Sequence, residues 1–212
     1  AAGQGGDAAY QVDRSLRFSS ADSAYLNKTP SSAGNRKTWT WSGWVKRCQF
    51  STLDGLFFQD TGSNDTDYGG IFFNTDGTLA FNGWSTVFRK TSAVYRDPGA
   101  WMHIVVVCDT TLSDADSRMR FYVNNDEITS WNTKNTITQN ADLSINKASE
   151  HRIGRVTTGY ANQYLTEIHF VDGQALAPTD FGEYDDNNVW QPKEFTGSYT
   201  STNTSTTLSQ TG

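Results

Sequence analysis

The amino-acid sequence predicts an all-β domain made of two packed antiparallel sheets, and three observations support this prediction. Apolar and polar residues alternate with a period of two in segments that recur along most of the chain, and no helical pattern extends beyond a turn or two. Turn-forming residues separate these segments, as in the hairpin sequences Asn74 to Gly77 and Asn124 to Glu127. The length of 212 residues suits one all-β domain, which at this size buries roughly 70% of the surface of the unfolded chain.

Thirteen strands are expected where β-branched and aromatic residues alternate with polar ones. In chain order they are Ser15 to Ser20, Ala24 to Lys28, Lys37 to Arg47, Gly55 to Gln59, Gly69 to Asn74, Thr78 to Asn82, Val87 to Lys90, Trp101 to Asp109, Arg118 to Asn124, Glu127 to Trp131, Leu143 to Ile145, His151 to Gly154 and Tyr164 to Val171. So many short strands in one chain require two packed sheets. The expected helix, one or two turns long, begins in Ala177 to Phe181, where Pro178 suits its first position.

The composition divides the chain into a Gly/Ala-rich leader or linker (1–13), the sandwich (14–184) and a polar C-terminal extension (185–212). Because the first residue is Ala, we expect a processed end or a cut from a longer chain. The end of the extension is almost entirely Ser, Thr, Asn and Gly, which bury too little apolar area to offset their ordering entropy. It is therefore a linker, a disordered end, or an extended arm that pairs with a neighbouring subunit.

Charge, hydropathy and cysteine content exclude several classes. The net charge of −6 and the pI of about 4.9 argue against a nucleic-acid partner, which needs a basic surface. Nothing approaches the ~18 consecutive apolar residues of a membrane span, so no membrane partner is expected. Cys48 and Cys108 lack the paired spacing of a zinc site. They are either two free buried thiols or one bridge between strands.

Three segments, in family order, resemble the laminin-G-like and pentraxin-like members of the concanavalin A-like lectin/glucanase superfamily. The first is Trp39 to Lys46 (WTWSGWVK), which is similar to an early core strand of that family. The second is the hairpin from Trp101 to Asn125, and the third runs from His151 through Tyr164 to Leu176. The resemblance spans about residues 15–184 and implies a jelly-roll sandwich.

Two longer stretches, residues 15–47 and 167–183, are similar to the version of this domain carried by structural proteins of marine tailed bacteriophages. That resemblance implies a virion component, in a fibre or tail protein, that faces the host or the medium. It also implies other virion proteins as partners and a homo-oligomer within the particle.

No pattern for catalysis is evident, and the sequence predicts that the chain is not an enzyme. Glycosidases related to this fold carry paired carboxylates at alternate positions of one strand, because one protonates the leaving group while the other attacks or activates water. Asp126 and Glu127 are adjacent and therefore point apart, whereas Glu183, Asp185 and Asp186 lie near or beyond the end of the predicted sandwich. His103, His151 and His169 lie in separate strands with no marked nucleophile.

Calcium is the cofactor for which this sequence offers candidate ligands. The loop from Asp60 to Asp67 offers four oxygen ligands, namely Asp60, Asn64, Asp65 and Asp67, and hard oxygen ligands suit Ca²⁺. The loop lacks the register of an EF-hand, so the alternative is a solvated turn. In addition, this chain has Thr166-Glu167 where relatives carry Asp-Glu in the closing strand, which removes one ligand that the resemblance would supply.

Sugar binding requires an aromatic platform with a few placed polar groups. Trp84 with Asn82 and Arg89 fits this description, as does a second group formed by Tyr160, Asn162 and Tyr164. The alternatives are an edge aromatic that covers a neighbouring strand and a structural loop that closes the sandwich. Trp39 and Trp41 share a strand face and Trp44 lies on the other, so at least one set belongs to the core.

Together these observations predict a non-catalytic carbohydrate-binding or adhesion domain on the surface of a virion, with a cell-surface glycan as its partner. Many weakly binding copies on a symmetric particle would gain avidity. The alternative is a purely structural module of a capsid decoration or fibre, which assembles through its terminal arms.

Overall fold

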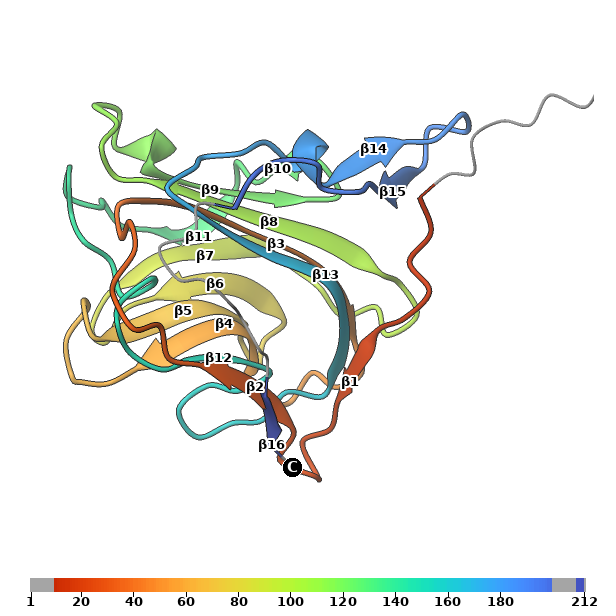
Figure 1. Cartoon of the computed structure of the whole chain (residues 1–212), viewed down its shortest axis with the longest axis horizontal. Coiled ribbons are helices and arrows are strands. Elements are labelled where there is room, and N and C mark those ends of the chain that lie inside the picture. The colour runs from red at the N-terminus through yellow and green to blue at the C-terminus, as the bar shows by residue number, and fades with distance from the viewer. Residues whose placement is uncertain (1–9, 200–208, 212) are drawn as a thin grey trace, which may run out of the picture.

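The computed structural model describes residues 10–199 and 209–211, in which two large antiparallel sheets pack face to face (Figure 1). The first sheet, sheet A, has the order β1-β13-β3-β8-β9-β10. Its strands are β1 (Leu16–Phe18), β13 (Gln163–Asp172), β3 (Thr38–Arg47), β8 (Met102–Asp109), β9 (Met119–Val123) and β10 (Asp126–Glu127). The predicted all-β, two-sheet jelly-roll sandwich is confirmed.

The second sheet, sheet B, has the order β11-β7-β6-β5-β4-β12-β2-β16. Its strands are β11 (Trp131–Lys134), β7 (Val87–Val94), β6 (Thr78–Asn82), β5 (Tyr68–Phe73), β4 (Asp54–Asp60), β12 (His151–Ile153), β2 (Tyr25–Lys28) and β16 (Ser209–Thr211). The backbone of β16 pairs antiparallel with β2 of its own chain, from Ser209 opposite Asn27 to Thr211 opposite Tyr25.

The core lies between the sheets and follows from the alternation along each strand. In β3, the fully buried Trp39, Trp41 and Val45 belong to the inter-sheet core, whereas Ser42 and Trp44 face the other side. This confirms the predicted division of the three tryptophans. Sheet B contributes phenylalanine, leucine and isoleucine side chains to the other side of this core, among them Leu56, Ile71, Phe73, Leu79 and Phe81.

A third layer covers the outer face of sheet A. The 3₁₀ turn η2 (Pro178–Asp180) leads into a hairpin of β14 (Gly182–Tyr184) and β15 (Trp190–Pro192), which lies along this sheet (Figure 1). Phe181 and Phe195 pack there with Val105, Val107 and Val171. Trp190 is buried and donates a hydrogen bond from Nε1 to Nδ1 of His103 (3.1 Å). Packing therefore continues beyond residue 184, where the sequence placed the end of the sandwich.

Three predicted elements differ from the structure. Leu143 to Ile145 is an irregular segment, although Leu143 and Ile145 are buried in the core. The strand predicted from Glu127 to Trp131 is two short strands, because β10 pairs with β9 of sheet A whereas β11 pairs with β7 of sheet B. The predicted helix is the single 3₁₀ turn η2, in which the carboxylate of Asp180 accepts a hydrogen bond from the backbone N–H of Ala177 (2.9 Å).

A buried ion pair joins the end of β3 to the start of β4. Nη2 of Arg47 lies 2.8 Å from Oδ2 of Asp54, and both side chains are fully buried. Nη1 of Arg47 also donates to the carbonyl of Tyr95 (2.7 Å), and the guanidinium lies over the ring of Phe73. Burial raises the pKa of Asp54, whereas Arg47 opposes this shift. The pair needs both partners, since either charge left alone in the interior is costly.

Both cysteines are free thiols in the structure. Cys48 is half-buried, and Cys108 is fully buried in the inter-sheet core, where burial raises the pKa of its thiol. The prediction of two free thiols is therefore confirmed, but only Cys108 of the two is buried. The leader was predicted over residues 1–13, of which 1–9 lie outside the described residues, as do 200–208 and 212 of the tail. Within the described part of the chain, no helix has the length and apolar character needed to span a membrane.

Candidate functional site

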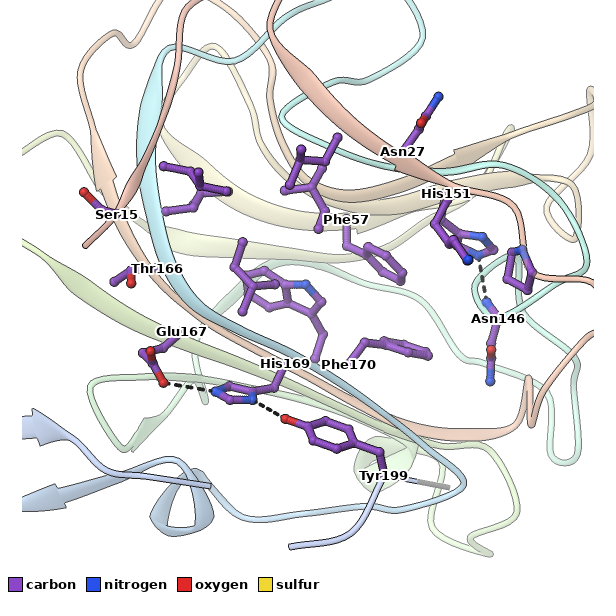
Figure 2. A pocket seen from close by; sticks show the side chains of 18 of the residues that line it. Ser15, Asn27, Phe57, Asn146, His151, Thr166, Glu167, His169, Phe170 and Tyr199 are labelled. Carbon is purple, nitrogen blue, oxygen red and sulfur yellow. Dashed lines mark hydrogen bonds and ion pairs between the residues drawn. The ribbon is translucent and has the colours of Figure 1, made fainter. Parts of the chain in front are cut away.

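A cavity of about 770 Å³ opens between the sheets, at the edge where β1 and β13 of sheet A face β2 and β12 of sheet B. Figure 2 shows Phe57 and Phe170 in its middle and the labelled polar side chains around them. Its apolar lining residues are Leu16, Leu26, Pro30, Trp41, Phe57, Ile153, Leu165, Ile168 and Phe170. The cavity is thus apolar in its interior and polar at its rim.

A bulge in β13 shapes one side of this rim. Thr166 pairs with Trp44 and His169 with Ser42, so two residues, Glu167 and Ile168, stand opposite the single Gly43. Glu167 adopts a φ of 47°, in the left-handed region that non-glycine residues seldom occupy. The extra residue breaks the alternation, and both Glu167 and Ile168 line the cavity as a result.

Glu167 and His169 contact two tyrosines, Tyr10 and Tyr199, and Figure 2 shows Glu167, His169 and Tyr199 of this group at the rim. Oε2 of Glu167 accepts a hydrogen bond from the hydroxyl of Tyr10 (2.9 Å) and lies 3.5 Å from Nε2 of His169. Nδ1 of His169 lies 2.6 Å from the hydroxyl of Tyr199. Burial, with further effect from Glu167, raises the pKa of Tyr10 to about 12, and burial lowers the pKa of His169 although Glu167 opposes this shift.

His151 occupies the opposite rim in a neutral state. Nε2 accepts a hydrogen bond from the backbone N–H of Asn146 (2.9 Å), which leaves Nδ1 to donate to the carbonyl of Ser149 (2.9 Å). The ring stacks on Phe57 with 5.2 Å between centroids. Burial lowers the pKa of His151 to about 4, so its ring adds no charge to the cavity at neutral pH.

Trp84 forms a second candidate site on the outer face of sheet B. It lies in the loop between β6 and β7, is 53% exposed, and meets the ring of Tyr68 edge to face at 5.2 Å. Tyr68 in turn packs edge to face on the buried Phe58 at 5.1 Å. The exposed indole therefore rests on an aromatic row that anchors it to the sheet, and we call Trp84 and Tyr68 the aromatic platform.

Asp65 holds the loop that carries Trp84. Its Oδ1 accepts hydrogen bonds from the backbone N–H groups of Ser85 (2.9 Å) and Thr86 (3.3 Å), and its Oδ2 accepts one from the hydroxyl of Thr86 (2.5 Å). A Cβ atom at Gly83 would lie 2.5 Å from Oδ1, so this close approach requires glycine there. Burial alone would raise the pKa of Asp65, but these hydrogen bonds outweigh it and lower the pKa.

The carboxylates of the predicted calcium loop therefore contact protein groups. Asp65 binds the Trp84 loop, and Asp67 pairs with Lys147 and with the amide of Asn64 (2.7 Å). Asp60 faces Arg152 at 4.0 Å. In the described part of the chain no three His, Cys, Asp or Glu side chains gather as a metal site would require. A bound Ca²⁺ would compete with these protein groups for the same oxygens, and calcium binding stays a prediction.

Of the first predicted sugar-binding group, Asn82 lies near Trp84 and Arg89 does not. Asn82 ends β6 beside the Trp84 loop, but Arg89 is 1% exposed and donates to the carbonyls of Met119, Phe88 and Asn135. Arg89 cannot reach a sugar at Trp84, because the interior holds its guanidinium. This part of the prediction is corrected.

The side chains of the second predicted group each contact another part of the protein. The ring of Tyr160 lies against Arg155, which also covers Tyr25. The amide of Asn162 donates to Gln49 (3.0 Å), and the ring of Tyr164 lies beneath Arg17 at 5.1 Å. Sugar binding by this group stays a prediction.

The sequence analysis did not single out the cavity. The sequence analysis placed His169 in a strand with no marked nucleophile beside it. The departure at Thr166-Glu167 was visible, but it signalled a missing metal ligand rather than a bulge. Among the described residues that line the cavity, Glu167 is the only acid.

Comparison with known proteins identifies the fold. A family model described as the concanavalin A-like lectin/glucanases superfamily matches residues 18–176. No curated protein matches the chain. Among solved structures, a putative carbohydrate binding protein from Bacteroides ovatus aligns with a TM-score of 0.52 at 14% identity, covering 78% of this chain and 44% of that one.

Enzymes are among the similar structures, and this corrects a prediction. Trypanosoma rangeli sialidase in complex with the inhibitor DANA aligns with a TM-score of 0.51 at 14% identity, covering 81% of this chain and 27% of the sialidase. A heptameric SAP-like pentraxin from Limulus polyphemus aligns at 16% identity with a TM-score of 0.48, covering 80% of this chain and 75% of that one. The present chain spans about a quarter of the length of the Trypanosoma rangeli sialidase. The prediction that the chain is not an enzyme is contradicted, because sialidases share its fold; at such identity the likeness shows the fold alone.

Proposed function

The chain belongs to the concanavalin A-like lectin/glucanase superfamily, and from this premise we propose that it is a lectin-like domain that binds carbohydrate at the aromatic platform of Trp84 and Tyr68. The observation that carries the proposal is the exposure of Trp84. An indole that is 53% exposed, yet braced by a second ring and by a fixed loop, offers a rigid apolar surface.

Such a surface suits the apolar face of a pyranose ring. Stacking removes apolar area of both partners from water, and the loss of side-chain freedom is small because Tyr68 and the loop already restrict the indole. Exposed Ser85 and half-buried Asn82 and Thr86 lie beside the platform in the chain and supply polar groups for sugar hydroxyls. The similar fold of the putative carbohydrate binding protein from Bacteroides ovatus supports the same assignment.

The test is a glycan array with the domain presented multivalently, run once with Ca²⁺ and once with a chelator. We expect binding in both conditions, and we expect Trp84→Ala to weaken it at least tenfold, which corresponds to about 1.4 kcal/mol. Tyr184→Ala is the matched control, because Tyr184 is also an exposed aromatic (47%) but lies on the hairpin over sheet A. Equal loss in both variants, or a blank array, would contradict the proposal.

We propose further that the domain is displayed on the surface of a bacteriophage particle, as a homo-oligomer among other virion proteins, and that it contacts cell-surface glycans there. The proposal rests on the resemblance that residues 15–47 and 167–183 suggest, from the sequence alone, to the version of this domain in virion proteins of marine tailed phages. Many copies on one particle would convert weak single-site binding into avidity. Antibodies against the domain should label intact particles of a phage that encodes it; labelling confined to infected-cell lysate would refute this location.

A further inference from the structure

We propose that the cavity between the sheets is a binding site for a straight-chain fatty acid, with the acyl chain between the sheets and the carboxylate at the rim. The site is separate from the aromatic platform, which lies on the outer face of sheet B. The proposal depends on the lining of the cavity and on the charges at its rim.

The interior of the cavity matches an acyl chain. Nine of its lining residues are apolar, and they come from both sheets, so a chain between them would contact apolar groups on two sides. A volume of about 770 Å³ falls within the range of roughly 300–1,000 Å³ that is typical of small-molecule sites. A sugar would leave its hydroxyls without partners against Phe57, Phe170 and Leu165, whereas a hydrocarbon chain has none to satisfy.

The rim selects an anionic head group. Its charged lining residues are Arg14, Lys28 and Glu167. The carboxylate of Glu167 is engaged by Tyr10 and His169. Within the described residues, by contrast, neither the guanidinium of Arg14 nor the ammonium of Lys28 has a hydrogen-bond or ion-pair partner, and the neutral His151 adds no charge. Two cations without partners beside an apolar cavity complement a carboxylate joined to a hydrocarbon chain.

The test is isothermal titration of the full chain with octanoate, decanoate and dodecanoate. Burial of each methylene contributes about 0.8 kcal/mol, which corresponds to about a fourfold fall in Kd per added methylene, so decanoate should bind about 15-fold more tightly than octanoate. Decanol is the probe for the head group, and it should bind more weakly than decanoate. No binding at any length, or a Kd that does not change with length, would overturn the proposal.

Two kinds of variant test the contacts to the head group and to the acyl chain separately. Lys28→Ala with Arg14→Ala should weaken decanoate at least tenfold and leave decanol within about twofold, because only the acid uses the charges. Ile168→Glu, which places a charge at a half-buried bulge position of the lining, should weaken both probes. Trp84→Ala is the control and should change neither. Equal losses of acid and alcohol in the double variant would overturn the assignment of the rim.

Discussion

The substitution Asp65→Ala separates the role of a loop anchor from that of a calcium ligand. In the structure, this carboxylate accepts three hydrogen bonds from Ser85 and Thr86, the two residues that follow Trp84. Removing it frees the loop without touching either ring of the aromatic platform. We therefore expect the domain to stay folded and the sugar affinity to fall.

The expected magnitude follows from these contacts. Hydrogen bonds to a charged group contribute about 1.5–3 kcal/mol each when buried, but Asp65 is half-exposed, so we expect a total loss of about 1–2 kcal/mol in the free energy of unfolding. Binding must then order the released indole, which costs about 0.5–1.5 kcal/mol. The Kd for a glycan identified on the array should rise about threefold to tenfold.

The assay is titration calorimetry with that glycan, with and without a chelator, and Asp67→Ala as the control. Asp67 belongs to the same loop but pairs with Lys147 and Asn64 rather than with the Trp84 loop. Its loss should change the Kd less than twofold. If both substitutions abolished binding and the chelator did so too, a shared metal ion would be the common cause and the loop-anchor argument would be refuted.

Three further predictions concern the core. Because burial lowers the pKa of His151 to about 4, below the ordinary value of about 6.5, its neutral ring stabilises the fold above pH 6.5. That contribution of about 3 kcal/mol is lost as the pH falls toward 4, so wild type should lose more stability than His151→Gln between pH 7 and pH 4 in urea titrations. Asp54→Ala should lower the free energy of unfolding by about 3–5 kcal/mol, because it leaves the charge of Arg47 buried alone. The double variant that also carries Arg47→Met should recover part of this loss, and a double variant no more stable than Asp54→Ala would contradict the argument. In a native thiol titration, Cys48 should react first and Cys108 only upon unfolding; two equally fast thiols would show that the core opens readily.

The sequence predicted most of the sandwich because alternation reports burial directly. Thr78–Asn82 has the bounds expected, and β3, β8 and β13 differ from the prediction by at most one residue at an end. The segment from Glu127 to Trp131 failed for a physical reason: it reads as one extended run, but the chain leaves sheet A after Glu127 and joins sheet B at Trp131. Alternation does not reveal which sheet a strand joins.

The candidate sites were less predictable, because they depend on contacts between distant segments. Arg89 looked like a surface partner of Trp84, since arginine is seldom buried, but backbone carbonyls from three segments accept its hydrogen bonds in the interior. The role of Asp65 was missed because its partners lie 20 residues or more further along the chain. The cavity depends on a positive φ at Glu167, which composition and periodicity do not indicate.

Strand β4 explains how sites of two different chemistries can lie back to back on one sheet. Phe57 faces the cavity, and the next residue, Phe58, faces outward and packs on Tyr68 beneath Trp84. Because successive side chains of a strand point to opposite faces, the apolar interior and the aromatic platform share a backbone but no side chain. A substitution that removes sugar binding at Trp84 should therefore leave the cavity intact, and one that fills the cavity should spare the platform. The two proposals can thus fail independently.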